Sequence, residues 1–377
     1  MMKNLKFLAM MFAAALSFAA CEPVDGGEEV GDGELVLKAN PAIILCDGKY
    51  ASTLEATIGG KAVTSGVSIF DDKNNPVELS NMKFTTTKAG IYTFWASYGD
   101  KISNEVTITA VVEFPAATEI PLDPNPNSTS FVRKVMLTQF TGTSCGFCPF
   151  MVNCIKQLPA AVSKHCILTA AHRFNQDDPA LLAGAALEQT MAVGGFPTLA
   201  VDMHSLESDY RYPALIRSMI QSAIDREDAK VGIAACASYN DKSRMVAVKA
   251  EVKAAVTGNY RIGAWLLEDG IYGKQANNGA TGYDYDTHDN CIRIADSKVT
   301  GTDYTGYYLG EIKAGEKKVF EFNPTNMTLD KSWKAENCRL VIFVTCEGAA
   351  SQYTVNNWYV NNAVVCPLNS SVAYQYK

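Results

Sequence analysis

The chain has 377 residues, of which 47% are hydrophobic and 19% are charged. This length and composition are enough to bury more than one hydrophobic core, and they predict two to four domains. The formal net charge of −7 is spread without large basic clusters, which argues against a nucleic-acid partner. After the N-terminal apolar run, the sequence contains no stretch long and apolar enough to span a bilayer as a helix.

The N-terminal residues are typical of a targeting signal. Lys3 and Lys6 precede an apolar run over residues 7–20 that ends in small side chains, as in secretory signal peptides. The end of this run, Ser-Phe-Ala-Ala-Cys, resembles the lipobox of bacterial lipoproteins, which implies that Cys21 is acylated and becomes the mature N-terminus. We therefore predict a lipoprotein signal peptide over residues 1–21 and a protein tethered to the membrane through lipid. A plain secretory signal is the alternative.

Three segments of different composition follow. Residues 22–34 are Gly-rich and acidic, which predicts a solvated tether. They also resemble the surface-export signals of Bacteroidetes lipoproteins, with a periplasmic spacer as the alternative. Residues 35–112 contain short strands separated by turn signals, and the strands over 89–98 and 106–111 resemble the end of a bacterial immunoglobulin-like module. Residues 113–130 hold four prolines and predict an extended, semi-rigid linker.

Two cysteines at C-x-x-C spacing, Cys145 and Cys148, form the motif around which the rest of the chain is organised. The apolar run over residues 135–140 predicts a buried strand before them, and apolar residues at helical spacing follow them. Strand, turn, two cysteines and helix are the arrangement of a thioredoxin-like redox motif. A helix N-terminus favours the thiolate, and a second thiol three residues later can resolve a mixed disulfide.

Further along, a Gly-Gly-Phe segment precedes Pro197, which opens an apolar strand. This pattern predicts a cis peptide bond in a tight turn. Together with Cys145 and Cys148, Pro197 resembles the C-x-x-C and cis-proline loop of thioredoxin-like proteins, which implies that this loop packs beside the disulfide. The chain departs from that family at two positions. Ser144 replaces the usual tryptophan, and Gln139 replaces the buried acid that assists proton transfer. Glutamine neither takes nor gives a proton, which argues against efficient turnover of the pair.

Three roles are open for Cys145 and Cys148. They are a redox-active pair, a structural disulfide of the kind an exported chain normally keeps oxidised, or half of a zinc site that would need a second pair of ligands. Cys154 and Cys166 are a candidate structural disulfide between the first helix and the next strand. Two buried free thiols are the alternative for that pair. The pairing of the five later cysteines cannot be deduced from their spacing.

Other polar candidates carry weaker signals. His172 lies at the end of a predicted strand over residues 166–172, where a structural histidine is preferred over a site residue. A cluster of aspartates beside His288 offers oxygen ligands suited to calcium, but its spacing matches no EF-hand pattern, and a solvated loop is preferred. We expect no cofactor and no metal.

The second half of the chain changes pattern once. Residues 131–228 alternate strands with helices, including helices predicted over 179–193 and 212–226, which indicates an α/β thioredoxin-like domain. From there on, strands joined by polar loops predict a β-sandwich domain over residues 229–377. The predicted fold is therefore multidomain: an all-β immunoglobulin-like module, an α/β thioredoxin-like domain and a C-terminal β-sandwich.

Two segments, residues 267–271 with Gln275 and residues 287–293, resemble stretches that follow the C-x-x-C domain in Omp28-related outer-membrane lipoproteins of Bacteroidetes type. Residues 140–143 also resemble that family. The resemblance covers about residues 132–368. It implies a lipid-anchored outer-membrane location, on the periplasmic or cell-surface face, and it implies no particular activity.

Two functions follow as alternatives. In the first, the protein is a thiol–disulfide oxidoreductase of the envelope, with protein thiols or disulfides as partners. Cys145 is then the attacking thiolate, Cys148 is the resolving thiol, and Pro197 shapes the substrate groove. In the second, it is a non-enzymatic surface protein for binding or adhesion, and its C-x-x-C pair is a structural disulfide.

Overall fold

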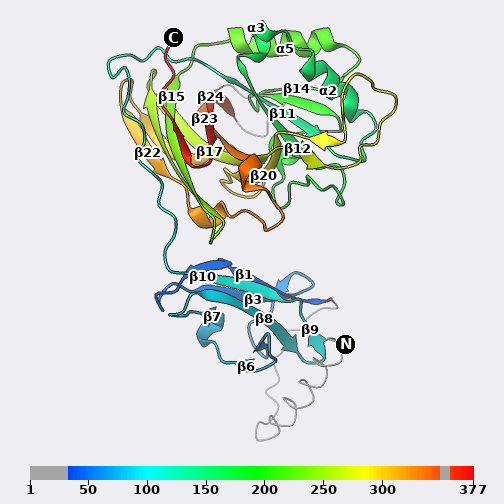
Figure 1. Cartoon of the computed structure of the whole chain (residues 1–377), viewed down its shortest axis with the longest axis vertical. Helices are drawn as coiled ribbons and strands as arrows, with labels where there is room; N and C mark the ends of the chain where they lie inside the picture. Colours follow the sequence, from blue (N-terminus) through cyan, green and yellow to red (C-terminus); the bar gives the residue numbers. More distant parts are fainter. Residues whose placement is uncertain (1–32, 349–356) are drawn as a thin grey trace, which may run out of the picture. The chain divides into compact units, whose positions relative to one another are not determined.

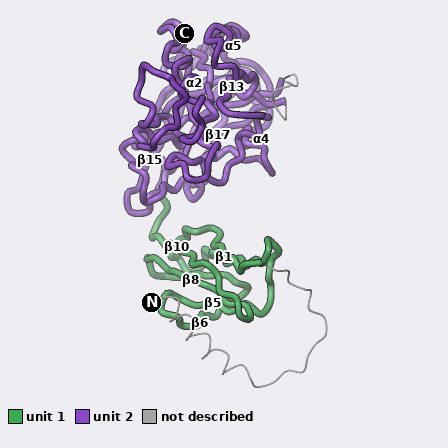
Figure 2. The backbone as a smooth tube through the Cα atoms, turned by 90° about the vertical axis from the view of Figure 1, so that its right-hand side faces the viewer, with its two compact units in different colours: residues 1–114 green, residues 115–377 purple. Residues whose placement is uncertain are grey.

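The computed structural model describes residues 33–348 and 357–377, and the chain divides into two compact units. Unit 1 ends at Phe114, and unit 2 runs from Pro115 to Lys377 (Figure 2). The chain forms a mostly β protein with several sheets and few helices. The predicted signal peptide, the predicted acylation site Cys21 and most of the predicted acidic tether lie outside the described residues.

Unit 1 contains two β-sheets that share one core (Figure 1). One sheet has the order β1-β3-β4 with β7 beside β3, and the other has the order β2-β10-β8-β5-β6 with β9 beside β8. The strands predicted over residues 89–98 and 106–111 are confirmed as the antiparallel pair β8 and β10. Buried side chains of both sheets, among them Leu37, Leu54 and Ile108, pack together. The strands are β1 (Leu35–Asn40), β2 (Ile43–Leu45), β3 (Ser52–Ile58), β4 (Lys61–Ala62), β5 (Ser68–Asp71), β6 (Pro76–Val77), β7 (Lys83–Phe84), β8 (Gly90–Tyr98), β9 (Lys101–Ile102) and β10 (Val106–Val111).

The largest sheet of unit 2 has nine strands, in the order β14-β13-β11-β12-β20-β17-β23-β24 with β21 beside β17. All residues of the inner strand β11 are buried, as expected of a strand covered on both faces. β11 runs parallel to β12 and antiparallel to β13, and β13 is antiparallel to β14. The strands are β11 (Val135–Thr141), β12 (Cys166–His172), β13 (Thr198–Val201), β14 (Ser205–Glu207), β17 (Gly258–Glu268), β20 (Cys291–Asp296), β21 (Tyr307–Ile312), β23 (Cys338–Glu347) and β24 (Trp358–Pro367).

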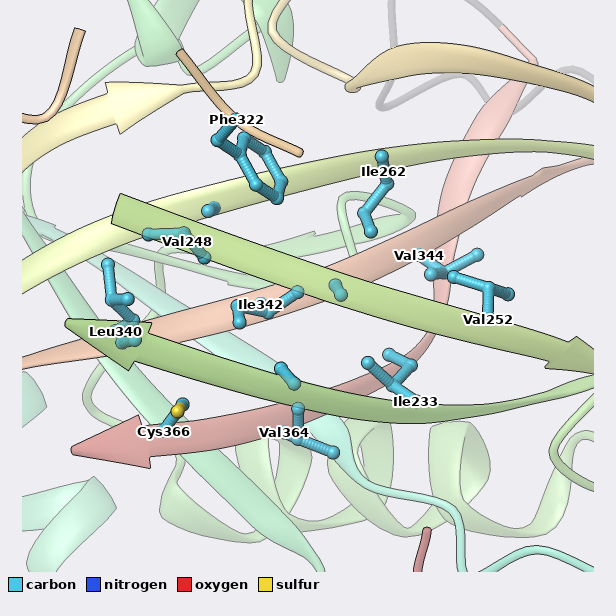
Figure 3. Close-up of a cluster of buried hydrophobic side chains, with 14 of the residues drawn as sticks. Ile233, Val248, Val252, Ile262, Phe322, Leu340, Ile342, Val344, Val364 and Cys366 are labelled. Atoms are coloured by element: carbon cyan, nitrogen blue, oxygen red, sulfur yellow. The ribbon is translucent and has the colours of Figure 1, made fainter. Parts of the chain in front are cut away.

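A second sheet of unit 2, in the order β22-β16-β15-β25, packs against the part of the large sheet formed by β17, β23 and β24. Figure 3 shows this core, where Ile233 and Val248 of the second sheet meet Ile262 and Ile342 of the large one. Each strand turns alternate apolar side chains toward the other sheet, as sheet-on-sheet packing requires. The strands are β15 (Val231–Asn240), β16 (Met245–Ala254), β22 (Lys317–Glu321) and β25 (Ser370–Val372).

The large sheet crosses the boundary predicted between residues 228 and 229. Strands β11 to β14 come from the segment predicted as thioredoxin-like, and β20, β17, β23 and β24 come from the segment predicted as a β-sandwich. The two segments therefore share one sheet within one compact unit. Their division into separate domains stays a prediction.

The described part of unit 2 contains four short α-helices. The helix predicted over residues 212–226 is confirmed as α5, and α2 follows the first strand as predicted. Side chains of α2 and α5 pack with Leu137 of β11 and Val201 of β13, so both helices cover this part of the large sheet. The helices are α2 (Cys148–Lys156), α3 (Ala160–Ser163), α4 (Leu187–Thr190) and α5 (Pro213–Asp225).

The helix predicted over residues 179–193 is wrong, because only α4 within that range is helical. Gly184 has a φ of 74°, which an α-helix does not accept. Leu181 instead forms a β-bridge with His172 at the end of β12. Tertiary pairing with the sheet therefore overrides the helix propensity of the Ala- and Leu-rich sequence.

The second half of the predicted linker is held against the β15–β16 sheet. The ammonium of Lys253, on β16, lies 3.0 Å from Oδ2 of Asp123, and both side chains are buried. Lys253 also donates to the carbonyl of Pro126 at 2.7 Å, and the Tyr376 hydroxyl donates to Asp123 at 2.6 Å. A buried charge is tolerated only when paired and hydrogen-bonded, so these contacts fix the segment on unit 2.

Candidate functional site

The C-x-x-C pair lies where β11 ends and α2 begins. Cys145 and Cys148 are joined by a disulfide with their Cα atoms 5.4 Å apart. Pro149 occupies the first turn of α2, where its missing N–H removes no helical hydrogen bond. The backbone N–H of Cys145 donates to the carbonyl of Gly142 at 3.0 Å, which closes the turn. The two cysteines are only 3% and 1% exposed, so the disulfide is buried.

A segment from the second half of unit 2, residues 273–286, covers this disulfide turn; we call it the strap. Its main contact is the side-chain amide of Gln275, which is itself buried. Nε2 of Gln275 donates to carbonyl oxygens of the turn at 3.0–3.1 Å, those of Gly142, Thr143 and Cys145. The amide has two hydrogens to share among these oxygens, which also accept from the backbone N–H groups of Cys145, Ala276 and Cys148. The side chain therefore adds to hydrogen bonds that the turn already makes.

The backbone of the strap also pairs with the turn. The N–H of Ala276 donates to the carbonyl of Thr143 at 2.7 Å, and the N–H of Asn278 donates to the carbonyl of Gly146 at 2.9 Å. A Cβ atom at Gly146 would lie 2.6 Å from Oδ1 of Asn278. Glycine between the two cysteines therefore permits the close approach of the strap.

The strap continues along α2. The hydroxyl of Tyr285 donates to Oδ1 of Asn153 at 2.7 Å, and Nδ2 of Asn153 donates to the carbonyl of Thr281 at 3.1 Å. The ammonium of Lys156 lies 5.0 Å from the ring centroid of Tyr283, within the range of a cation–π contact. The strap is therefore fastened at both the start and the end of α2.

The two segments that resemble Omp28-related proteins hold the ends of the strap. They carry the antiparallel strands β18 (Ile271–Tyr272) and β19 (Thr287–His288). Before β18, Glu268 forms a buried ion pair with Arg293, with 2.8 Å between Oε2 and Nε. The carboxylate of Asp269 pairs with the guanidinium of Arg339. Glu268, Asp269 and Arg293, which lie in the segments that resemble Omp28-related proteins, therefore have a structural role in holding the ends of the strap.

The aspartates considered as calcium ligands are hydrogen-bonded within and beside the strap. Asp284 accepts from the N–H of Asp286, and Asp286 accepts from the N–H of Gln275, both at 3.0 Å. Asp289 accepts from the N–H of Gly270 at 3.0 Å. Within residues 33–348 and 357–377 there is no group of three or more His, Cys, Asp and Glu that could hold a metal ion. The cluster therefore acts in shaping the loop.

A cavity of about 90 Å³ lies between α2, β11, β12 and the strap. Gln139, at the position of the family's buried acid, lines it, and its Nε2 is buried without a hydrogen-bond partner in the described part of the chain. His172 and His288 also line the cavity, and their ring centroids are 4.9 Å apart. Two imidazoles therefore line the same cavity as Gln139, whose side-chain amide neither takes nor gives a proton.

Asp178 links this cavity to the disulfide turn. Its Oδ2 lies 2.9 Å from Nδ1 of His172 and accepts from the N–H of Thr143 at 2.7 Å, while Oδ1 accepts from the N–H of Ala180 at 2.8 Å. Burial acts to raise the pKa of Asp178, but these hydrogen bonds outweigh it and lower the pKa to about 2. Asp178 is therefore ionised at neutral pH, and Nδ1 of His172 is the donor.

Replacing Asp178 by asparagine is expected to destabilise unit 2 by about 1–3 kcal/mol at neutral pH, because the amide has one acceptor oxygen where the carboxylate has two. The native carboxylate has a lowered pKa, so its contribution is present above the ordinary value of 3.8 and is lost as the pH falls toward about 2. Urea unfolding across this range checks both effects. Asp177→Asn, at an exposed neighbour, is the control; equal midpoints for the two variants would contradict the assignment.

Pro197 lies at the same edge of the sheet as the disulfide turn. The peptide bond between Phe196 and Pro197 is cis, as the sequence predicts. Thr198, the first residue of β13, pairs with Phe140 near the end of β11. The ring of Phe196 contacts those of Phe140 and Phe174, with centroids 6.4 and 5.6 Å apart. Cys145, Cys148 and Pro197 are therefore carried by the ends of neighbouring strands.

A groove runs beside Pro197, lined by residues 194–198, residues 206–208 and Tyr210. The ring of Tyr210 stacks on Phe150 and on Phe147, with centroids 5.4 and 5.6 Å apart. Phe147, between the two buried cysteines, is 47% exposed. The surface next to the disulfide is therefore aromatic.

Cys154 and Cys166, the candidate structural disulfide, are free thiols here. The thiol of Cys154 donates to the carbonyl of Tyr210 at 3.3 Å, and the thiol of Cys166 donates to the carbonyl of Val162 at 3.4 Å. Burial raises the pKa of both thiols, that of Cys166 to about 12. Cys154 is buried and Cys166 is half-buried, and the raised pKa disfavours the reactive thiolate at both positions.

Sequence reasoning did not find Asp178 and gave Gln275 and His288 no role. Asp178 lies in a polar loop segment, and nothing in its neighbours indicates that it will be buried. Gln275 appears in the sequence only as part of a family-like segment. The turn residues that its side chain contacts lie more than 100 positions away, with Gly142 at a separation of 133. The family resemblance was the one signal that pointed to it.

The chain is a mostly β protein with several sheets and few helices. The family model described as outer membrane protein Omp28 matches residues 185–364, so the chain carries an Omp28-family domain there. That range begins after the C-x-x-C pair and includes Pro197, the strap and most of the β strands that follow. No curated protein matches.

Two solved structures show weak similarity. One is the protein AGR_C_4864 from Agrobacterium tumefaciens, at 9% identity and a TM-score of 0.38, covering 62% of this chain and 94% of that one. The other is domains 4–9 of the surface layer protein SbsC, at 10% identity and a TM-score of 0.16, covering 92% of this chain and 52% of that one. Both scores are too low to show a common fold.

Proposed function

We propose that this chain is a lipid-anchored outer-membrane protein whose thioredoxin-like domain acts in binding, with the C-x-x-C disulfide kept as a structural brace. The description of the matched family suggests the outer membrane, and the lipid is attached at Cys21. No helix in residues 33–348 or 357–377 is long and apolar enough to cross a membrane. The proposed parts after the signal peptide are a tether (22–34), an immunoglobulin-like module (35–112), a linker (113–130), the thioredoxin-like domain (131–228) and a β-sandwich (229–377).

The thioredoxin-like assignment is supported by topology. The strand order β14-β13-β11-β12 combines a parallel pair, β11 and β12, with β13, which is antiparallel to β11 on its other side, and β14, which is antiparallel to β13. A helix that starts at the second cysteine connects the parallel pair, and α5 follows the last strand. Together with the positions of Cys145, Cys148 and Pro197, this arrangement resembles the thioredoxin-like unit expected from the sequence.

The burial of the disulfide under the strap is the observation that favours a structural disulfide over a catalytic cysteine pair. Exchange requires a thiolate to reach one sulfur of the disulfide along the S–S axis, and Cys145 and Cys148 are 3% and 1% exposed. Gln275 and the strap backbone occupy the main-chain side of the turn. In addition, Gln139 cannot accept the proton that a resolving thiol must lose.

The aromatic groove beside Pro197 supports a role in binding. Aromatic side chains at a surface supply large contact area at low entropic cost and are enriched at protein interfaces. Phe147, which stacks on Tyr210, and Phe174, which contacts Phe196, are 47% and 48% exposed. We infer that the partner is a protein segment with apolar side chains, which would cover these rings.

A thiol–disulfide oxidoreductase is the second candidate. It is favoured by the position of Cys148 at the first residue of α2 and by the strand-end position of Pro197. In that case, the strap would have to leave the turn in each catalytic cycle.

Reduction of the native protein separates the two candidates. At about pH 7.5, a water-soluble phosphine is expected to reduce the disulfide at least about 100-fold more slowly in native than in urea-unfolded protein, because access needs strap opening. The reduction potential is expected below about −300 mV, as in structural disulfides. Insulin reduction should equal that of the Cys145→Ser/Cys148→Ser variant.

Gln275→Ala is the matched variant, because it removes the strap contact and leaves both cysteines. Losing these hydrogen bonds weakens the closed state by about 1.5 kcal/mol, so reduction should accelerate about tenfold. Insulin reduction that the native protein performs and the double cysteine variant lacks would refute the brace and support the oxidoreductase.

A further inference from the structure

Two buried histidines lie next to each other beside the ends of the strap, one on β12 of the large sheet and one on β19, directly after the strap. His172 ends β12 and is 1% exposed, and His288 ends β19 and is 9% exposed. Their ring planes meet at 84°, with centroids 4.9 Å apart. The inference drawn from this pair rests on the proposed function, in which the closed strap protects the disulfide.

Each imidazole uses one nitrogen to hold the closed state. Nδ1 of His172 donates to Asp178, which also accepts from the N–H of Thr143 in the disulfide turn. Nε2 of His288 lies 2.9 Å from the carbonyl oxygen of Gly273. A carbonyl only accepts, so Nε2 carries the proton. His288 therefore joins the end of the strap to its beginning, two residues before Gln275.

The charges around His288 decide how it responds to acid. The buried carboxylate of Asp178 acts on His288, but it is already hydrogen-bonded to His172 and to two backbone N–H groups. The titratable and charged groups that face the cavity or pack beside it are His172 from β12, Asp178 from the loop after it, Lys156 from α2, Asp284, Tyr285 and Asp286 from the strap, Asp289 after β19, and Cys291 from β20.

Burial and the neighbouring His172 lower the pKa of His288, against smaller opposite effects of Gly273, Asp178 and Asp286. A histidine whose pKa is lower in the closed state than in the open state favours the open state as protons bind. The closed strap is therefore fully stable above the ordinary value of 6.5 and loses stability as the pH falls below it.

We propose that the strap is an acid-sensitive latch: protonation of His288 releases β18 and β19 from each other and uncovers the buried disulfide. A protonated His288 has no carboxylate of its own, and an unpaired buried charge is unstable. Moving His288 into water relieves this. The same movement takes away the hydrogen bond to Gly273 and, with it, the support for Gln275 over the turn.

The test measures disulfide reduction by the same phosphine at about pH 7.5 and about pH 5. In this reaction, phosphorus attacks one sulfur and the S–S bond breaks. Water supplies the oxygen of the phosphine oxide and, with the medium, the protons of the two thiols. Rates are divided by those of a small exposed disulfide, which removes the effect of phosphine protonation. The native protein is expected to be reduced about tenfold faster at the lower pH, since one proton changes an opening equilibrium by up to tenfold per pH unit.

His288→Gln is the decisive variant. Its amide can still donate to Gly273 but takes no proton, so reduction should be slow at both pH values. His172→Gln, which removes the neighbouring imidazole that lowers the pKa of His288, should also flatten the pH profile and serves if the first variant folds poorly. His165→Gln, outside the cavity, should keep the native profile. Circular dichroism at both pH values verifies that the variants are folded.

The outcomes separate this inference from the proposed function. Slow reduction of the native protein at both pH values would leave the brace intact and overturn the latch. Fast reduction at both pH values would overturn the proposed protection itself. Acceleration at low pH that persists in both His288→Gln and His172→Gln would overturn the assignment of the latch to this histidine pair.

Discussion

Asp202→Asn is expected to destabilise unit 2 by about 3–5 kcal/mol, as measured by urea unfolding at neutral pH. The native carboxylate is fully buried, and its Oδ2 lies 2.6 Å from the guanidinium of Arg133 and 3.1 Å from that of Arg226. Oδ1 accepts from the N–H of Met136 at 2.8 Å. Asparagine would leave Arg133, whose side chain is 6% exposed, without its counter-charge.

Asp209→Asn is the matched control. Asp209 forms an ion pair with Arg211 at 2.8 Å, but the arginine side chain is 70% exposed. Exposed pairs contribute about 0–1 kcal/mol, so this variant should unfold close to the native midpoint. A similar small change for Asp202→Asn would mean that solvent reaches Arg133 in the folded protein.

Glu268→Gln is the second change with a large expected effect. Glu268 is 4% exposed, and its two oxygens accept from Nε of Arg293 and from the N–H of Lys334, both at 2.8 Å. Gln keeps the shape but removes the charge and one acceptor, and it leaves Arg293 buried without a carboxylate. The expected loss in the free energy of unfolding is about 3–5 kcal/mol.

Because this ion pair lies at the base of the strap, the substitution also reports on the site. Phosphine reduction of the native disulfide should accelerate in Glu268→Gln. Lys274→Met is the control within the strap: Lys274 pairs with Asp286 at 3.0 Å, but its side chain is 83% exposed, so the expected change is below about 1 kcal/mol. If both variants unfolded at the same urea concentration, the ion pair of Glu268 would not anchor the strap.

Local sequence patterns predicted several elements that depend mainly on neighbours in the chain. The apolar run before the cysteines is β11, the helical spacing before residue 226 is α5, and the Gly-Gly-Phe-Pro segment contains the cis peptide bond. In each case, the periodicity or the turn residues lie within the element itself. The helix predicted over residues 179–193 failed, because pairing of Leu181 with His172 is a tertiary contact.

The sequence by itself determined the C-x-x-C pair, its place between a strand and a helix, and Pro197 as the other strand-end residue. It left open whether the pair is exposed. Only the tertiary structure decided that point, because the groups that bury the disulfide come from Gln275 and its neighbours, 130 or more positions from the carbonyls they cover. Contacts at such separations leave no periodic trace in the sequence. They follow from β20 joining β12 in one sheet, which brings the strap over the start of α2.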